Sequence, residues 1–163
     1  HVQLMGSGTI LREVIKAADM LKTDYSVSAD VWSVTSFNEL RRDGLTIERY
    51  NAMHPQEKEQ ECYVAKQLKG RPGPVIAATD YMRLYAEQIR AYIPNYYVTL
   101  GTDGYGRSDT RERLRHFFEV DAKFIVLAAL NALVAEGSID KSKVVDAMKR
   151  YNINPDKLNP VNH

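Results

Sequence analysis

The sequence has little of what would mark a secreted, membrane-spanning or nucleic-acid-binding protein. Its single cysteine, Cys62, cannot form an internal disulfide, which predicts a reducing, cytoplasmic setting. The longest apolar run, Phe124–Leu130, is too short to cross a bilayer. The first residues lack the basic-then-apolar pattern of a signal peptide. The formal net charge is only +1 at pH 7, so neither nucleic acid nor a membrane is expected as a partner.

Residue patterns for several common catalytic centres are missing as well. The sequence has no G-x-S-x-G motif, and Cys62 has no neighbouring histidine that would activate a thiol. No two histidines are spaced as a metal pair on one helix. Gly6–Thr9 (GSGT) suits an anion at a helix start, but Leu11 stands where a G-x-G-x-x-G motif needs its third glycine. We therefore interpret Gly6–Thr9 first as an ordinary strand-to-helix turn.

What the sequence does contain is an alternation of short strands and amphipathic helices. Strands are expected at 2–5, 30–35, 75–79 and 96–100. Helices are expected at 10–22, 36–44, 55–69, 81–91, 109–118, 121–137 and 138–151. This alternation predicts an α/β fold, a three-layer α/β/α domain whose mostly parallel sheet has four strands in the order 2-1-3-4 and whose extra helices lie at the carboxyl end. We expect a single domain over residues 1–163, with an extended tail at 152–163.

Helix boundaries in the first half are expected from capping and breaking residues. Ser36 and Glu39 have the spacing of a capping box. Gly44 is expected to end that helix, which leaves residues 45–53 irregular or weakly helical. Pro55 fits the first position of a charged helix that follows.

The stretch 96–118 is typical of a strand, a glycine loop and a capped helix. Ser108 is a candidate cap, and so is Asp109, which has capping-box spacing to Glu112. Parallel sheets place binding groups in loops at the carboxyl ends of their strands, so these loops are our candidates for interdomain or anion contact. The candidate residues are Gly6, Ser7, Gly8, Thr35, Asn38, Glu39, Asp80, Asp103, Arg107, Ser108, Asp109 and Arg111. The alternative is a well-formed turn beside a solvated row of arginines.

Two further helices carry predictions about which side chains are covered. The helix at 81–91 is expected to turn Leu84, Tyr85 and Ile89 inward. The helix at 121–137 is apolar nearly all round, so it is either central to the domain or part of an interface. Its candidate interface residues are Phe124, Leu127, Leu130 and Asn131.

One pattern has a partial likeness to the magnesium motif of thiamine diphosphate enzymes. Gly101–Gly104 reads G-T-D-G, and Asn131 follows later in the chain. The motif requires an uninterrupted Gly-Asp-Gly, and here a threonine is inserted. Asn131 also lies inside an apolar helix, whereas the metal needs an oxygen ligand at a loop end. We reject this pattern as a metal site, and we assign no catalytic, cofactor-binding or metal-binding residue.

Longer runs of the sequence resemble one enzyme family. These runs are VQLMGSGTILREVIKAA, DVWSVTSFNELRRDG, GPVIAATDYMRLYAEQIR, LGTDGYGRSDTRERLRHFFEVD and YNINPDKLNP. Through them essentially the whole chain closely resembles the carboxyl-terminal domain of the bacterial homodimeric, acetyl-transferring pyruvate dehydrogenase family, which has a transketolase carboxyl-terminal-like fold. That family's sheet has a fifth, antiparallel strand that comes first. This chain starts just after it, so we expect a fragment of a longer protein.

The resemblance implies a bacterial, cytoplasmic parent enzyme that decarboxylates pyruvate on thiamine diphosphate with Mg²⁺. That enzyme then passes the acetyl unit to the lipoyl group of the dihydrolipoamide acetyltransferase component. The family's catalytic and cofactor-binding groups belong to two preceding domains, so this fragment is expected to bind no cofactor and to have no turnover. Its implied partners are those preceding domains, a second copy of the chain in a homodimer, and the acetyltransferase. The alternative is a regulatory domain that binds an anion or nucleotide at the carboxyl ends of the strands.

Overall fold

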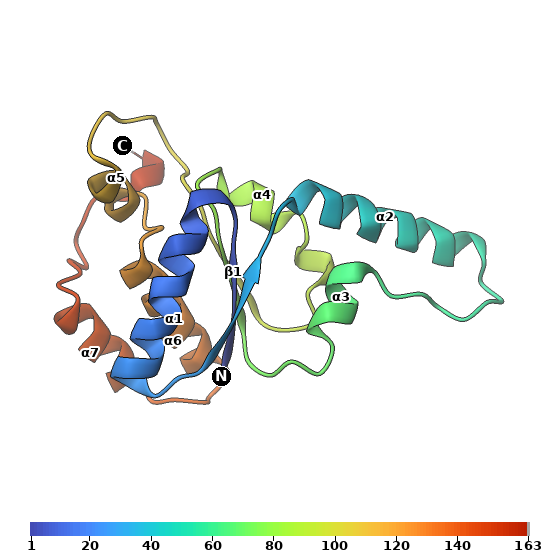
Figure 1. Cartoon of the computed structure of the whole chain (residues 1–163), viewed down its shortest axis with the longest axis horizontal. Coiled ribbons are helices and arrows are strands. Elements are labelled where there is room, and N and C mark those ends of the chain that lie inside the picture. The colour runs from blue at the N-terminus through green and yellow to red at the C-terminus, as the bar shows by residue number, and fades with distance from the viewer. Residues whose placement is uncertain (163) are drawn as a thin grey trace.

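A computed structural model describes residues 1–162 of the chain (Figure 1). Its four strands form one parallel sheet in the order β2-β1-β3-β4, which confirms the predicted topology. The strands are β1 (Val2–Gly6), β2 (Ala29–Ser33), β3 (Val75–Ala78) and β4 (Tyr97–Leu100). In the register of the sheet, Leu4 of β1 lies between Val31 of β2 and Ile76 of β3. Within the described residues, β2 and β4 are therefore the edge strands.

Helices cover both faces of the sheet, as the alternating sequence pattern predicts (Figure 1). One face carries α1 (Leu11–Tyr25) and α6 (Ala122–Ala135), with α7 (Ser142–Arg150) packed on α6. The other face carries α2 (Phe37–Met53), α3 (Tyr63–Leu68) and α4 (Arg83–Glu87). The remaining segments are α5 (Arg111–Phe117) and three 3-10 turns, η1 (Gly8–Ile10), η2 (Arg90–Tyr92) and η3 (Pro160–Asn162). No helix in residues 1–162 is both long and apolar enough to cross a bilayer.

The central strands divide their side chains between the two hydrophobic cores because successive residues of a strand point to opposite faces. Leu4 and Ile76 belong to the core under α1 and α6, whereas Met5 and Ala77 belong to the core under α3 and α4. Gln3 is fully buried among these apolar groups. Its amide donates to the carbonyl oxygen of Pro72 (3.0 Å) and accepts from Trp32 Nε1 (2.9 Å), so its burial leaves no polar atom unpaired.

Helix α2 differs from the prediction at both Gly44 and Pro55. Ser36 caps it as expected by accepting a hydrogen bond from the Glu39 N–H (3.2 Å). The helix then continues through Gly44 to Met53, so the predicted stop at Gly44 is wrong. Gly44 is buried against the ring of Tyr92, and a Cβ at this position would overlap that ring. The glycine at this position gives close packing and does not end the helix.

The charged helix predicted from Pro55 is largely absent, since α3 begins only at Tyr63. Side chains of α2 fix the intervening segment. Asn51 donates to the carbonyl oxygen of Gln60 and accepts from its N–H, both at 2.9 Å. Asp43 Oδ2 accepts from the Tyr63 N–H at 2.6 Å and so sets the start of α3. These contacts between distant residues override the local helical preference of the charged segment.

Helices α4 and α5 also depart from the sequence analysis. Leu84 and Tyr85 of α4 are exposed, and Ala86 and Ile89 are the buried residues, so the predicted inward face is only correct at Ile89. The cap of α5 is Thr110, whose Oγ1 accepts from the Arg113 N–H (3.4 Å). The predicted caps at Ser108 and Asp109 are therefore wrong. Asp109 Oδ1 instead accepts from the Thr110 N–H at 2.7 Å.

Candidate functional site

The loops that follow β1, β3 and β4 meet at the carboxyl edge of the sheet, where the sequence analysis places its candidates. Thr9 Oγ1 donates to Asp80 Oδ2 at 3.3 Å, and Gly8 lies beside the same carboxylate with a backbone φ of +56°. Thr102 Oγ1 donates to the carbonyl oxygen of Asp80 at 2.7 Å. Ser7 donates its N–H to the carbonyl oxygen of Ala78 at 3.2 Å. The candidates Gly6, Ser7, Gly8 and Asp80 are thus neighbours in the structure.

Asp103 links the loop after β4 to the beginning of α4. Its Oδ1 accepts from the Arg83 N–H at 3.0 Å, and its Oδ2 lies 3.4 Å from Arg83 Nε. The backbone of Gly101 passes so close to Arg83 that a Cβ there would overlap its amide nitrogen. Asp103 therefore acts within the chain as the group that satisfies a free amide at the helix start.

A hollow of about 670 Å³ opens beside these loops. Its lining includes Thr9, Asp80, Tyr105, Arg107, Asp109 and Arg111. The guanidinium of Arg107 lies 4.0 Å from the centre of the Phe117 ring, a cation–π contact that holds it at the rim. Ser108 is exposed near this rim. Negatively charged carboxylates and positively charged guanidinium groups both border the hollow, so it can contact polar groups of either charge.

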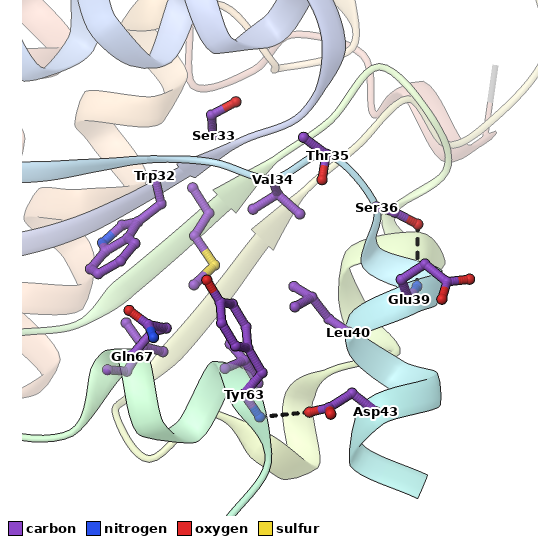
Figure 2. A pocket seen from close by; sticks show the side chains of 13 residues that line it. Trp32, Ser33, Val34, Thr35, Ser36, Glu39, Leu40, Asp43, Tyr63 and Gln67 are labelled. Carbon is purple, nitrogen blue, oxygen red and sulfur yellow. Dashed lines mark hydrogen bonds between the residues drawn. The ribbon is translucent and has the colours of Figure 1, made fainter. Parts of the chain in front are cut away.

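A second hollow, of about 400 Å³, lies between β2, α2 and α3 (Figure 2). Trp32 and Tyr63 contribute aromatic walls, and the candidates Thr35 and Glu39 lie at its border. No sequence pattern marks Trp32 or Tyr63 as a site residue. Trp32 fits an ordinary strand pattern, and Tyr63 falls in the middle of the predicted helix 55–69, whereas α3 in fact begins at Tyr63.

The third region is an exposed apolar patch on and before α4. Tyr81, Met82, Leu84 and Tyr85 are all exposed, and 64% of the surface of Leu84 is accessible. The candidate Asn38 borders this patch, and its Oδ1 accepts from Gln88 Nε2 at 2.9 Å. Exposed large apolar side chains grouped in this way are typical of surfaces that contact another protein. Sequence periodicity places Leu84 and Tyr85 inward. The five residues of α4 are too few for periodicity to show which side of the helix is buried.

Ionic and hydrogen-bonding groups tie α4 to β4 beneath this patch. Arg90 Nε and Nη2 contact the two oxygens of Glu87 at 2.6 and 2.7 Å, and the Thr99 hydroxyl donates to the same carboxylate. The hydrogen bonds from Arg90 hold the pKa of Glu87 below its ordinary value. Burial raises the pKa of Tyr97, whose hydroxyl donates to the carbonyl oxygen of Ala86 at 2.8 Å. The exposed patch is therefore carried by a helix that is firmly bonded to β4.

The four candidate interface residues of α6 do not share one environment. Phe124 and Leu130 are buried in the core of the chain, and Leu127 is partly buried. Asn131 is exposed, and its Nδ2 donates to the carbonyl oxygen of Leu127 at 3.0 Å. Among these four, only Leu127 and Asn131 present surface that a partner could contact.

The chain matches one known domain family over most of its length. The model of the transketolase-like TK C-terminal domain matches residues 1–121. The chain belongs to this family. A solved structure of a "Split gene transketolase, inactive beta4 tetramer" shares the fold, with a TM-score of 0.55 at 18% sequence identity. The match covers 82% of this chain and 39% of the other.

Several curated relatives of this transketolase-like domain are named "Pyruvate dehydrogenase E1 component". The proteins of Cupriavidus necator and Pseudomonas aeruginosa are each 59% identical over 99% of this chain. The Escherichia coli K12 protein is 54% identical over 98% of the chain. These matches confirm the resemblance found in the sequence. The chain spans 18% of the length of each of these relatives.

Proposed function

We propose that this chain is the structural and interaction domain of a bacterial, cytoplasmic pyruvate dehydrogenase that depends on thiamine diphosphate. The full enzyme would decarboxylate pyruvate and transfer the acetyl unit to the lipoyl group of the dihydrolipoamide acetyltransferase component. The observation that supports this proposal is 59% identity over 99% of the chain to relatives named as the E1 component. Since the chain spans 18% of their length, the complete reaction is proposed for the longer protein.

The residues of this domain do not fit thiamine diphosphate and Mg²⁺. Asp103, the acidic residue of the G-T-D-G pattern, is engaged by Arg83. Asn131, the other residue of that pattern, is bonded to its own helix. Within residues 1–162, no three His, Cys, Asp or Glu side chains are grouped to hold a metal ion. We therefore place the cofactor in other domains of the parent protein, and we propose no turnover by this domain alone.

The carboxyl edge of the sheet is our proposed contact face for those other domains or for the second copy in a homodimer. The exposed patch of Tyr81, Met82, Leu84 and Tyr85 supports this choice, because burying it would remove a large apolar area from water. The polar loop of Asp103–Arg111 borders the neighbouring hollow and would form the rim of the contact.

A direct test measures turnover and assembly separately. The isolated chain, mixed with pyruvate, thiamine diphosphate, Mg²⁺ and a dye acceptor, should reduce no dye above the buffer rate. Clear turnover would overturn the proposal. In the full-length protein, Leu84→Ser should weaken dimer assembly measured by sedimentation. Val145→Ser, at an exposed apolar residue of α7 over the other face of the sheet, is the control.

A second candidate function is regulation by an anion or nucleotide. The hollow of about 670 Å³ favours it, because Arg107 and Arg111 both line that hollow. Calorimetry with phosphate, pyruvate, acetyl-CoA and nucleotides separates the two functions. Micromolar binding that is lost in Arg107→Ala would support the regulatory function, and no binding by any of them would exclude these ligands.

A further inference from the structure

The chain after α7 returns to the end of α5 and makes specific contacts there. Lys157 Nζ lies 2.8 Å from the carbonyl oxygen of Phe117 and 2.8 Å from Glu119 Oε1. The same amino group lies 5.4 Å from the centre of the Phe117 ring and 5.5 Å from that of Phe124. Only 17% of the Lys157 side chain is exposed. These partners offset the cost of enclosing an ammonium group, so removing them would destabilise this packing.

Glu119 occupies a backbone conformation that favours a different residue. Its φ is +62°, and it follows the last turn of α5. The Glu119 N–H donates to the His116 carbonyl oxygen (3.3 Å), and the Val120 N–H donates to that of Arg115 (2.9 Å). This is the helix ending at which glycine is usual. Glutamate is strained in this conformation, but its carboxylate binds Lys157, a contact that glycine could not make.

The end of the tail also contacts the glycine loop. Gly104 has a φ of +111°, and a Cβ at this position would overlap the carbonyl oxygen of Pro160. Pro160 itself is buried. Loop and tail are therefore packed backbone to backbone at Gly104, and Lys157 adds a second contact point at the far end of α5. The Phe117 ring connects this second contact to the loop, because Arg107 of the loop and Lys157 of the tail both lie over it.

We propose that residues 152–162, here called the strap, hold residues 101–110 in their observed conformation, and that the Lys157–Glu119 pair fastens the strap. Thr102 and Asp103 also bond to Asp80 and Arg83, so the strap is most important for residues 104–110, which are all exposed. Three residues that line the hollow of about 670 Å³, Tyr105, Arg107 and Asp109, lie on this loop. The strap therefore sets the shape of that hollow from a part of the chain some fifty residues away in sequence. The proposal stands whether or not the hollow meets another domain.

Hydrogen exchange of the whole chain, followed by mass spectrometry, tests this proposal. In Lys157→Met, the hydrogen-bonded amides within 101–110 (Thr102 and Thr110) and within 152–162 should exchange about tenfold faster, as expected for local opening, while β1 and β3 keep their rates. Lys143→Met, an exposed lysine on α7, should change neither segment. Equal acceleration everywhere, unchanged exchange, or acceleration confined to 152–162 would each overturn the proposal.

Glu119→Gly distinguishes the effect of the ion pair with Lys157 from the effect of backbone strain at the positive φ of residue 119. Glycine relieves the positive φ but removes the carboxylate. If Glu119 acts through Lys157, this variant should accelerate exchange of the 101–110 loop as Lys157→Met does, and the double variant should add little to either single change. If the positive φ were the only important feature, Glu119→Gly would slow exchange in the loop, and the proposal would fail.

Discussion

Glu13 of α1 and Arg115 of α5, 102 residues apart in sequence, form an ion pair in which Arg115 Nη1 lies 2.7 Å from Glu13 Oε1. Their side chains are only 17% and 16% exposed. The other oxygen of Glu13 accepts from the Ala122 N–H at 3.0 Å. One carboxylate on α1 therefore fixes both the end of α5 and the beginning of α6.

This arrangement predicts a large effect for Glu13→Ala. Removing the carboxylate leaves the largely buried guanidinium of Arg115 and the amide of Ala122 without their partner. We expect the free energy of unfolding to fall by about 3 kcal/mol, measured by urea denaturation. Glu136→Ala, at an exposed helix end, should change it by about 0.5 kcal/mol or less. An equal effect of both variants would contradict the bridging role of Glu13.

Gly44→Ala tests the close packing of α2 on Tyr92. Helix propensity alone would make this change stabilising by about 1 kcal/mol. We expect instead a loss of about 1–3 kcal/mol, because the added Cβ overlaps the Tyr92 ring. In a Tyr92→Ala background the overlap disappears, so Gly44→Ala should become neutral or stabilising. Thermal unfolding of the four proteins decides between the two explanations.

Glu87→Gln should reveal a pH-dependent contribution to stability. The pKa of Glu87 is lowered in the folded chain, chiefly by its hydrogen bonds from Arg90. A lowered pKa stabilises the fold above the unfolded value of about 4.3, and the contribution disappears as the pH falls through the folded pKa. We expect Glu87→Gln to cost about 1 kcal/mol at pH 7, and to cost progressively less as the pH falls below 4.

The control for this pH experiment is Glu59→Gln, on the exposed segment before α3. It should change the free energy of unfolding little at either pH. If the cost of Glu87→Gln were the same at pH 3 and pH 7, the charge of the carboxylate would not be what stabilises the link between α4 and β4.

The sheet and its order could be predicted from the sequence because each strand is marked by its own local pattern. A parallel α/β arrangement then follows from the alternation of strands with helices. The Ser36 cap was also predictable, since donor and acceptor lie three residues apart. The errors have a different origin. Gly44 and Tyr63 are positioned by Tyr92 and Asp43, which are distant in sequence, and no local pattern contains that information.

The candidate site was only partly predictable for the same reason. Polar residues at strand ends, such as Asp80, could be found because the topology places them there. The apolar patch around Leu84 could not, because in a helix as short as α4 the exposed face is set by what α2 and β4 leave uncovered. The partners of Glu119 and Lys157 were equally hidden, since 38 residues separate them.

The last prediction concerns the two faces of α6. Leu130 is fully buried, so Leu130→Glu should unfold the chain, because it places an unpaired charge in the core. Leu127 is only partly buried, and beside it Asn131 is exposed. We expect Leu127→Glu to leave a folded chain, seen by circular dichroism, whose self-association or assembly in the full-length protein is weaker by light scattering. Lys123→Glu, exposed in the first turn of the same helix, controls for the added negative charge. Unfolding by both leucine variants would mean that this helix serves only the core, and a folded Leu127→Glu chain with unchanged association would exclude this face as an interface.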